Sequence, residues 1–415
     1  MEQAKWLSII GIGESGLSEL SPLARGLLDR ASLVVGGKRH LAWLDASQAS
    51  MSWTSPIEKS IATILKYRGT PVCVLASGDP LCYGIGVTLL RSISIAEMVI
   101  IPAPSTFSLA CARLGWSLTE VETLSLCGRD PAFLSAILAP NTKLLVLSAD
   151  AKTPQIVADL LTQLGYGDSQ ILVLEHLGGE RERLIAGIAR SWAKSDVAAL
   201  NIIAIECTAD PDLTPLNRLP GLPDSAYHHD GQLTKREVRA MTLAALSPLP
   251  GELLWDVGAG CGSIGIEWLR SHPCCRAIAI EQHAHRLQFI TDNMSALGTP
   301  HLRLVQGKAP AALADLPTPD AIFIGGGVTA PALLDTCWTA LRSGGRLVAN
   351  AVTVESELQL LHWQQQVGGE LTRIAIQRTQ NIGGFLGWKP LIPVTQLVVV
   401  KRVEGGNGEG LLSSI

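Results

Sequence analysis

The segment ELLWDVGAGCGSIGIEW, residues 252–268, places a cluster of glycines between an apolar, strand-forming run and a run with helical spacing. A glycine-rich turn that ends a strand and opens a helix lets the backbone approach a ligand closely, because no Cβ atoms intervene. The next strand-like run, RAIAIE, ends at Glu281, about 20 residues after the turn, where a carboxylate can accept hydrogen bonds from ribose hydroxyls. We therefore predict a Rossmann-like sheet with a nucleoside site beside Glu281.

The order of these glycines, G-x-G-x-G, distinguishes between two kinds of nucleoside ligand. A dinucleotide site usually has the spacing G-x-G-x-x-G, which admits a pyrophosphate. The tighter order favours a ligand without phosphates, and it resembles the first motif of Rossmann-like methyltransferases, as do PDAIFIGGG and LRSGGRLVANAV further on. We keep two alternatives: an NAD(P)-linked oxidoreductase with two Rossmann-like sheets, and a non-catalytic binding protein that retains these folds.

Length and composition limit the class of protein. A chain of 415 residues, 47% hydrophobic and 17% charged, predicts more than one compact globular domain. The net charge of -4 gives no basic stripe for a phosphate backbone, so we expect no nucleic-acid partner. The nine cysteines are scattered without a CxxC pair, which predicts a reduced, cytoplasmic environment, and no apolar run is long enough to cross a membrane.

Alternating strand-like and helix-like runs predict an α/β protein whose two halves each form sheets with crossover helices. The segment 209–232 contains four prolines and little periodicity, which is typical of a linker. We predict a two-lobed domain over 1–208, with the lobes split near 125–140, and a doubly wound Rossmann-like domain over 233–403. Residues 404–415 are expected to form a flexible tail.

The N-terminal half has its own glycine loop, GIGESG, residues 11–16, after the strand-like run WLSII. The following strand ends at Gly36, Gly37 and Lys38 and offers no carboxylate for a ribose, so we reject a dinucleotide site. The segments SGDPLCYG (77–84) and PAPSTF (102–107) each follow a predicted strand. Open α/β sheets bind ligands at that end, so the two segments predict a cleft.

With these motifs in view, residues 5 to about 208 resemble the tetrapyrrole methylase family, through GIGESGLSEL, VLASGDPLCYG, PAPSTFSLACARLGW and LSLCGRDP. Residues 231 to about 402 resemble the decarboxylating precorrin methyltransferases, through QLTKREVRAMTLAAL, WDVGAGCGSIGIEW, GKAPAAL and FIGGG. The fusion of the two resembles the precorrin-6Y C5,15-methyltransferase (decarboxylating) family of cobalamin biosynthesis.

The resemblance implies a bifunctional enzyme in which each half binds its own S-adenosylmethionine. The N-terminal half would methylate C5 of the macrocycle of a precorrin-6 tetrapyrrole. The C-terminal half would methylate C15 and decarboxylate the ring C acetate, giving precorrin-8, and we expect a homo-oligomer. The implied donor-binding residues are Thr234, Gly258, Ala259, Gly260, Cys261, Gly262, Glu281 and Ala309 in the C-terminal half, and Gly78, Asp79, Cys82, Ser105 and Thr106 in the N-terminal half.

A substrate with many carboxylates needs cationic and amide donors around both clefts. The candidates are Lys38, Arg39, Arg113 and Arg129 in the first half, and Lys235, Arg236, Arg239 and Asn350 in the second, although a solvated surface charge is the usual role of such residues. We assign no catalytic nucleophile, because a sulfonium methyl group is already activated. The spacing of His272, Cys274, Cys275, His283 and His285 fits a zinc site poorly, so we expect no metal.

Overall fold

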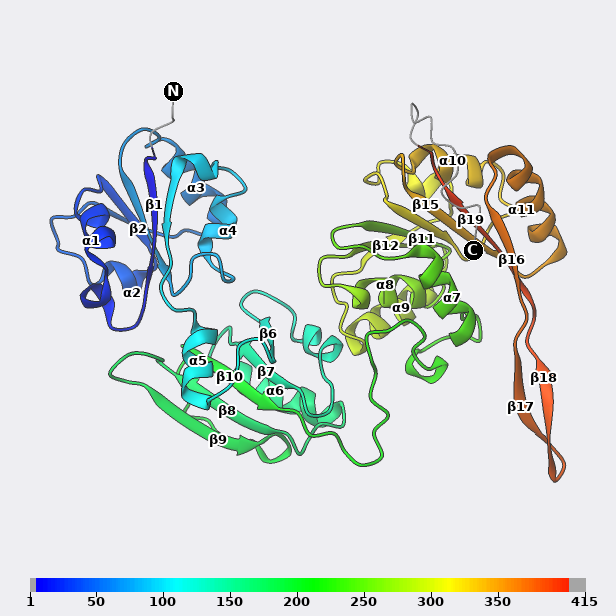
Figure 1. Cartoon of the computed structure of the whole chain (residues 1–415), viewed down its shortest axis with the longest axis horizontal. Coiled ribbons are helices and arrows are strands. Elements are labelled where there is room, and N and C mark those ends of the chain that lie inside the picture. Colours follow the sequence, from blue (N-terminus) through cyan, green and yellow to red (C-terminus); the bar gives the residue numbers. More distant parts are fainter. Residues whose placement is uncertain (1–4, 403–415) are drawn as a thin grey trace. The chain divides into compact units, whose positions relative to one another are not determined.

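The computed structural model describes residues 5–402, so the predicted tail at 404–415 lies outside the described residues. Within that range the chain forms two compact units. The N-terminal unit contains residues 5–131 and 139–215, and the C-terminal unit contains residues 132–138 and 216–402 (Figure 1). Among the described residues, no helix is both long and apolar enough to cross a membrane.

The first lobe of the N-terminal unit is a parallel sheet in the order β3-β2-β4-β1-β5. The strands are β1 (Leu7–Ile12), β2 (Leu33–Gly36), β3 (Ser50–Ser52), β4 (Val72–Ser77) and β5 (Met98–Ile101), and the helices are α1 (Pro22–Asp29), α2 (Lys38–Leu41), α3 (Ile57–Leu65) and α4 (Ile85–Leu89). Every residue of β1 is buried, as expected for a parallel strand covered on both faces. The carboxyl ends of these strands carry the predicted loops.

The second lobe is a mixed sheet in the order β6-β7-β10-β8-β9, in which only β6 and β7 pair in parallel. Its elements are β6 (Val121–Ser125), β7 (Lys143–Leu147), β8 (Gln170–Glu175), β9 (Arg183–Ile188), β10 (Asn201–Glu206), α5 (Thr106–Leu114) and α6 (Thr153–Gln163). Helix α5 packs on this sheet through Phe107, Ala110 and Cys111 (Figure 1). The chain therefore passes between lobes just after β5, and our prediction of a split near 125–140 is wrong.

The C-terminal unit is a sheet in the order β13-β12-β11-β14-β15-β19-β16, parallel from β13 to β15 and antiparallel at β19 and β16. The strands are β11 (Leu253–Val257), β12 (Arg276–Glu281), β13 (Arg303–Gln306), β14 (Ala321–Ile324), β15 (Arg346–Ala351), β16 (Glu370–Ile374) and β19 (Val394–Val400). This is the predicted doubly wound sheet, with β16 as an additional edge strand.

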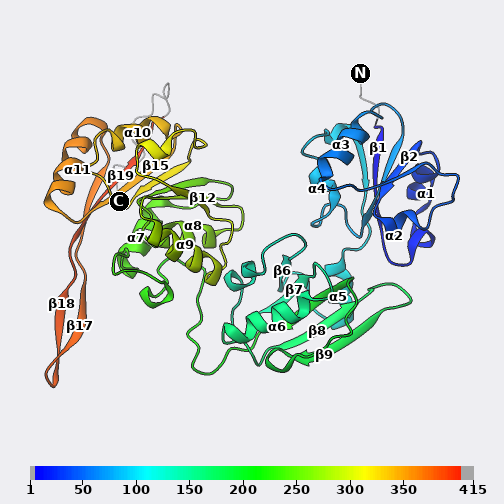
Figure 2. The same cartoon turned by 180° about the vertical axis from the view of Figure 1, so that it is seen from behind.

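Helices cover both faces of this sheet, as Figures 1 and 2 show. The helices are α7 (Arg236–Leu246), α8 (Ser263–Ser271), α9 (Ala284–Ala296), α10 (Leu333–Ala340) and α11 (Val354–Val367). Leu243, Trp268 and Ile290 bring α7, α8 and α9 into one core, whereas Leu334 and Trp363 bring α10 and α11 into the other. The sheet thus separates two cores, and its carboxyl edge stays free for a ligand.

The proline-rich segment 209–232 contains the boundary between the two units, after Pro215, as predicted, but both of its parts are packed. Its first part packs on the N-terminal unit, where the amide of Asp210 donates to the carbonyl of Gly165 at 2.8 Å. Its second part enters the C-terminal core, where Leu222 and Tyr227 are buried. This packing could not be predicted, because proline content reports the absence of regular structure and does not report whether a segment is packed.

A two-stranded hairpin projects from the C-terminal unit (Figure 1). It consists of β17 (Gln377–Ile382) and β18 (Phe385–Pro390), and it pairs only with itself. The sequence pattern gave us no strand here, because NIGGFLGWKP reads as a loop rich in glycine and proline. Its base reaches the carboxyl edge of the main sheet.

Candidate active sites

The C-terminal glycine loop adopts the conformation for which glycine is needed. Gly258, Gly260 and Gly262 have φ angles of +72°, +62° and +80°. A Cβ atom at Gly258 would lie 3.0 Å from the amide nitrogen of Gly326, which belongs to the loop after β14. A Cβ atom at Gly260 would make an ordinary van der Waals contact with the carbonyl oxygen of Gln232, at 3.6 Å, and would clash with nothing. The loop therefore exposes bare main chain to a cavity.

Glu281 ends β12 beside this loop and is only 4% exposed. Its Oε2 atom accepts the amide hydrogen of Gly260 at 2.9 Å, and its Oε1 atom accepts that of His283 at 2.9 Å. Each carboxylate oxygen keeps a further lone pair for a ligand hydroxyl. The carboxylate is thus held in place at the cavity wall.

Asp256 is a second buried carboxyl group behind the loop, and sequence reasoning gave it no role. Its Oδ2 atom accepts the amide hydrogen of Gly265 at 2.9 Å and ties the end of β11 to the first turn of α8. Burial, with a smaller contribution from the charge of Glu281, raises the pKa of Asp256 to about 7. Its position, two residues before the first glycine of the motif, is the signal that could have identified it.

The cavity at this edge has a volume of about 980 Å³. Seven of the eight implied C-terminal donor residues line it: Thr234, Gly258, Ala259, Gly260, Cys261, Glu281 and Ala309. Gly262 does not, because it starts α8 and a Cβ atom there would lie 2.9 Å from Ile290. Among the substrate candidates, Lys235 and Asn350 line the cavity.

Two of the predicted substrate-binding arginines lie outside the cavity lining; the prediction for Arg239 is wrong, and the role of Arg236 stays a prediction. Arg239 is fully buried, and its Nε atom donates to Glu267 at 2.5 Å. Arg236 donates from Nε to the carbonyl of Gly221 at 3.0 Å and does not line the cavity. The cations that do line it, and that we missed, are Lys308 and Lys389, together with Arg286, which pairs with Asp230.

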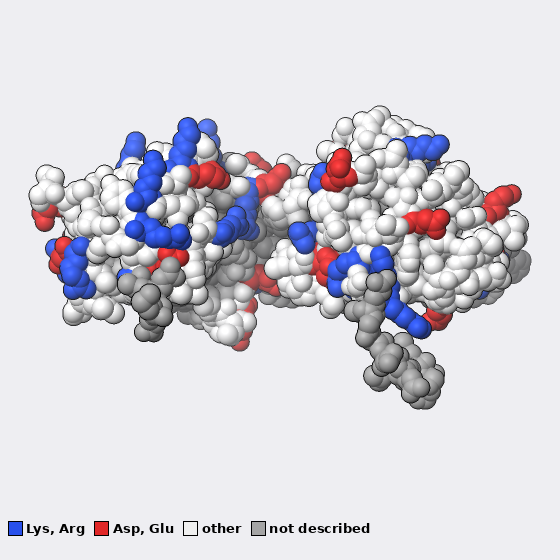
Figure 3. Space-filling view, turned by 90° about the horizontal axis from the view of Figure 1, so that it is seen from above, with Lys and Arg blue, Asp and Glu red and all other residues white. Residues whose placement is uncertain are grey.

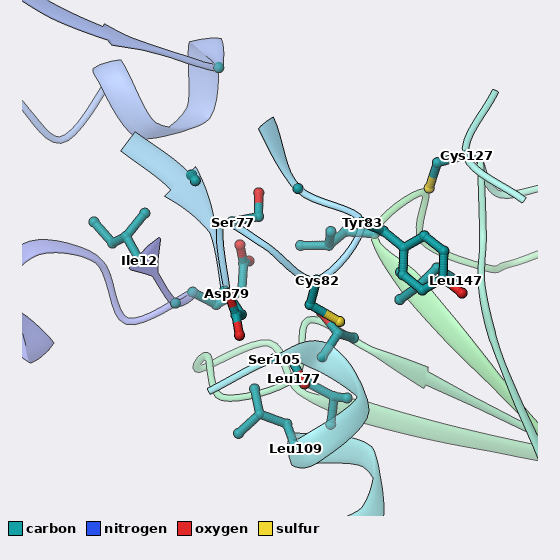
Figure 4. Close-up of a pocket in the computed structure, with 18 of the residues that line it drawn as sticks. Ile12, Ser77, Asp79, Cys82, Tyr83, Ser105, Leu109, Cys127, Leu147 and Leu177 are labelled. Atoms are coloured by element: carbon teal, nitrogen blue, oxygen red, sulfur yellow. The ribbon is translucent and has the colours of Figure 1, made fainter. Parts of the chain in front are cut away.

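The N-terminal unit contains a cavity of about 510 Å³, lined by both of its lobes. Figure 4 shows Asp79, Cys82 and Ser105 converging on this cavity from the loop after β4 and from the start of α5. All five implied donor residues, Gly78, Asp79, Cys82, Ser105 and Thr106, line it. The two loops that the sequence singled out therefore meet at one site.

Backbone geometry shapes these loops. A Cβ atom at Gly11 would lie 2.1 Å from the carbonyl oxygen of Gly78, which itself has a φ angle of +58°. Asp79 accepts the amide hydrogen of Leu81 at 2.8 Å and closes a tight turn. Ser105 caps α5 by accepting the amide hydrogen of Ser108 at 3.1 Å. Asp79 and Ser105 thus define the cavity wall through their contacts with main chain.

A charged network occupies one end of this cavity. Arg39 donates to Glu14 at 2.6 Å and to the hydroxyl of Ser77 at 2.7 Å. The other carboxylate oxygen of Glu14 lies 3.0 Å from Nδ1 of His176, which comes from the second lobe. Burial lowers the pKa of His40, beside Arg39, to about 4, so this imidazole is neutral near neutral pH. Arg39 was predicted, whereas Glu14 and His176 were missed.

The other N-terminal substrate candidates, Lys38, Arg113 and Arg129, lie outside the cavity lining, and their role stays a prediction. Arg113 pairs with Glu182 at 2.5 Å, and the guanidinium carbon of Arg129 lies 5.2 Å from the centre of the Tyr83 ring. Lys38 does not line the cavity either. Figure 3 shows many Lys and Arg side chains on the surface of this unit, with acidic and uncharged residues between them. A basic residue close to the cleft in sequence is therefore a poor indicator of a ligand contact.

Comparison with known proteins connects both cavities to one enzyme family. Residues 7–191 match the family of tetrapyrrole (corrin/porphyrin) methylases, and residues 225–401 match the precorrin methyltransferase domain. A precorrin-6Y C(5,15)-methyltransferase [decarboxylating] from a Sinorhizobium species is 48% identical over 94% of this chain and 95% of its own length. The chain belongs to the precorrin-6Y C5,15-methyltransferase (decarboxylating) family.

Other members of this family are also similar to the chain. The Mycobacterium tuberculosis protein of the same name is 44% identical over 95% of this chain and 99% of its own length. The crystal structure of the C-terminal domain of the Rhodobacter capsulatus precorrin-6Y C5,15-methyltransferase is 48% identical, covering 45% of this chain and all of that domain with a TM-score of 0.43.

Family membership makes the chain a methyltransferase, and it implies a reaction that depends on S-adenosylmethionine. The residues of the C-terminal cavity fit that cofactor, because Gly258 and Gly260 leave bare main chain next to a fixed carboxylate. An NAD(P)-linked oxidoreductase is not favoured by these matches. Both motif sets that carried the sequence resemblance lie in the matched regions.

Proposed function

We propose that this chain methylates C5 and C15 of a precorrin-6 macrocycle and decarboxylates the ring C acetate, giving precorrin-8. In this proposal the N-terminal unit methylates C5, and the C-terminal unit methylates C15 and releases carbon dioxide. The observation that carries it is a separate cavity in each unit, in a chain matched over 94% of its length by a relative named for both positions. We place the reaction in the cytoplasm, because all nine cysteines are unpaired.

We infer that each unit binds its own S-adenosylmethionine, which supplies an activated methyl group. In the C-terminal unit, the main chain of Gly258 to Cys261 and the carboxylate of Glu281 would hold the nucleoside, with Thr234 and Ala309 beside them. In the N-terminal unit, Gly78, Asp79, Cys82, Ser105 and Thr106 would form the corresponding wall. The main contribution of both units is alignment, which is worth about 7–11 kcal/mol in favourable cases.

The proposed substrate carries many carboxylates, which need cationic donors around both cavities. In the C-terminal cavity, Lys235, Lys308 and Lys389 have no ion-pair partner among the residues that the structure describes. In the N-terminal cavity, Arg39 is the lining arginine, and Glu14 and Ser77 orient its guanidinium. We propose that Lys235, Lys389 and Arg39 bind substrate carboxylates, whereas Lys308 follows β13, on the side of the cavity where the methyl donor would bind.

The product of the full-length protein tests the proposal. The protein would be incubated with a precorrin-6 substrate and with S-adenosylmethionine that carries a trideuterated methyl group. High-resolution mass spectrometry should then find a product with two deuterated methyl groups that has lost one carbon dioxide. A product with one added methyl group, or none, would contradict a two-site enzyme.

Blocking the N-terminal cavity should remove one of the two methylations. Cys82 lines this cavity and is partly buried, so the side chain of Cys82→Trp would fill the space proposed for S-adenosylmethionine. We expect C5 methylation to fall on the order of 100-fold. Liquid chromatography with mass spectrometry measures both products. Cys274→Trp is the matched control, because Cys274 is exposed and lines neither cavity. Equal loss of C5 and C15 methylation in Cys82→Trp would argue against separate sites.

We propose further that the protein forms a homo-oligomer through the β17–β18 hairpin. Phe385, Leu386 and Trp388 are 82%, 72% and 70% exposed, and the hairpin offers unpaired outer strand edges. Exposed apolar side chains on an unpaired edge favour pairing with a second copy. A partner of this kind would cover the apolar residues in solution.

The double variant Phe385→Asp/Trp388→Asp is expected to be monomeric under conditions in which the wild-type protein is oligomeric. Sedimentation velocity would measure the mass of each. Gln380→Asp changes an exposed polar residue of the same hairpin and should leave the assembly intact. A monomeric wild-type protein, or an unchanged mass in the double variant, would rule out this interface.

A further inference from the structure

Asn350 lies at the carboxyl end of β15 and lines the C-terminal cavity. Its side-chain amide is held by two buried residues from other elements. The amide nitrogen donates to the hydroxyl oxygen of Thr242 on α7 at 3.0 Å, and the amide oxygen accepts from the side-chain nitrogen of Gln396 on β19 at 2.9 Å. Thr242 is fully buried and Gln396 is 3% exposed, so the amide has a fixed setting.

The donors and acceptors of this cluster can be assigned in only one way. The hydroxyl of Thr242 donates to the carbonyl of Val238 at 2.8 Å, which uses its single hydrogen. It must therefore accept from both Asn350 and Gln396, which lie at 3.0 Å each. The amide oxygen of Asn350 then faces Gln396, and one amide hydrogen faces Thr242. The second amide hydrogen has no acceptor within residues 5–402 and remains for a ligand in the cavity.

The order of the strands in the sheet separates Asn350 from the residues that would hold the methyl donor, S-adenosylmethionine. The glycine loop, Glu281 and Ala309 follow β11, β12 and β13, whereas Asn350 ends β15 on the other side of β14. The lining on that side also includes Lys389 and apolar side chains at the base of the hairpin, namely Ile376, Leu391, Ile392 and Val394. Asn350 therefore faces the part of the cavity that is left for the methyl acceptor.

We propose, on the basis of the proposed function, that the free amide hydrogen of Asn350 binds the carboxylate that leaves the substrate as carbon dioxide. Thr242 and Gln396 are the positioning residues, because they act through Asn350. Lysine ammonium groups form charge-assisted hydrogen bonds that are roughly twice as strong as neutral ones. Lys235 and Lys389 suit carboxylates that remain in the product. A neutral amide orients a carboxylate without an ion pair, which would stabilise the negative charge on the carboxylate relative to the transition state, where that charge moves into the macrocycle.

The chemical step requires orientation and no proton transfer to the protein. The bond between the acetate methylene carbon and the carboxylate carbon breaks, and its electron pair moves into the conjugated imine system of the macrocycle. Carbon dioxide leaves, and the electron pair then returns from the conjugated system to the methylene carbon, which takes a proton from water to become a methyl group and leaves hydroxide in the solvent. Asn350 holds the carboxylate so that the breaking bond is perpendicular to the plane of the conjugated system. The apolar side chains at the base of the hairpin lie on the same side of the cavity.

The test separates methylation from decarboxylation in single-turnover reactions of the full-length protein. In Asn350→Ala, we expect donor binding and C15 methylation within about threefold of wild type, and decarboxylation slowed on the order of 10- to 100-fold by the lost alignment. The methylated, undecarboxylated compound should accumulate and be visible by mass spectrometry. Asn350→Lys should lower the substrate KM and also slow decarboxylation, because it adds the ion pair that Asn350 avoids.

Gln396→Leu tests the positioning role, because it removes the donor that fixes the amide of Asn350 while leaving Asn350 in place. We expect the methylated, undecarboxylated compound to accumulate again, with decarboxylation slowed by a smaller factor, about 5- to 20-fold. Gln377→Leu is the matched control, since Gln377 is exposed on the hairpin and does not line the cavity. If Asn350→Ala does not fold, as judged by circular dichroism, Gln396→Leu and Asn350→Lys carry the test.

Two results would overturn the inference: equal slowing of methylation and decarboxylation in the Asn350 and Gln396 variants, or wild-type decarboxylation in both. Failure of the proposed function would look different. In that case the wild-type protein itself would neither methylate nor decarboxylate a precorrin-6 substrate.

Discussion

Gly260→Asp is expected to abolish decarboxylation and C15 methylation while C5 methylation continues. Gly260 has a φ angle of +62°, and its amide donates to Glu281 at 2.9 Å. A Cβ atom there would clash with nothing, because its nearest neighbour is the carbonyl oxygen of Gln232 at 3.6 Å. Aspartate tolerates this backbone conformation better than most residues, so the chain should still fold. The new carboxylate would occupy the space proposed for S-adenosylmethionine and would repel the carboxylate of Glu281. Both effects should weaken binding of the methyl donor and reduce the C-terminal reactions on the order of 100-fold or more.

The control for this prediction is Gly251→Asp. Gly251 also has a positive φ angle, of +86°, and open space around it, but it precedes β11 and does not line the cavity. This variant carries the same backbone strain and added charge and should keep both methylations. Product analysis by mass spectrometry measures the reactions separately. Loss of C5 methylation in a folded Gly260→Asp protein would contradict independent sites.

Glu267→Ala should destabilise the C-terminal unit by about 3–5 kcal/mol, because it removes the closer of two carboxylate partners of the fully buried Arg239 and leaves Asp224, at 3.4 Å, as the other. Glu267 also accepts the hydroxyl of Tyr227 at 2.8 Å and the amides of Gly221 and Leu222 at 2.6 and 3.1 Å. The carboxylate thus joins α7, α8 and the segment before them. Native-state hydrogen exchange of α8 reports this unit specifically, and its opening free energy should fall by that amount.

Two comparisons make the stability prediction specific. The exposed pair Arg373 and Glu357, at 2.7 Å, should be worth less than about 1 kcal/mol when Arg373→Ala removes it. Replacing both buried partners, as Glu267→Leu with Arg239→Met, should recover much of the loss, because no unpaired charge remains. An effect of Glu267→Ala as small as that of Arg373→Ala would show that the buried network contributes little.

Local motifs predicted the parts of the site that depend on neighbouring residues in the sequence. The glycine loop and Glu281 could be found because a strand, a turn and a helix follow one another within about 30 residues. The loops at Gly78 and Ser105 could be found because each follows a strand of a parallel sheet. The positive φ angles of Gly78 and Gly260 are a further reason for glycine at these positions, which we did not predict from the sequence.

Contacts between distant residues were not predictable from local pattern. Arg239 has the appearance of a surface charge on α7, but its partner Glu267 lies 28 residues away on α8. Glu14 and His176 meet across 162 residues and from different lobes. Asn350 was selected from its strand end alone, whereas the residues that fix its amide come from α7 and β19. Tertiary packing decides which polar side chains are used internally and which remain for a ligand.

The hairpin and the lobe boundary show a second reason for failure. Ile382 and Phe385 flank Gly383 and Gly384, which is a hairpin pattern. We did not predict the two strands, because the prolines and glycines nearby are typical of a loop. The helix α5 follows a first-lobe strand in sequence, yet its apolar face packs on the second lobe. Sequence order alone does not tell which sheet covers a helix.

The central claim is that one chain contains two independent sites for the methyl donor. Calorimetric titration of the full-length protein with S-adenosylmethionine measures this most directly. We expect two equivalents for the wild-type protein, one for Gly260→Asp, one for Cys82→Trp and none for the double variant. A single equivalent in the wild-type protein, or loss of both equivalents in either single variant, would contradict the claim.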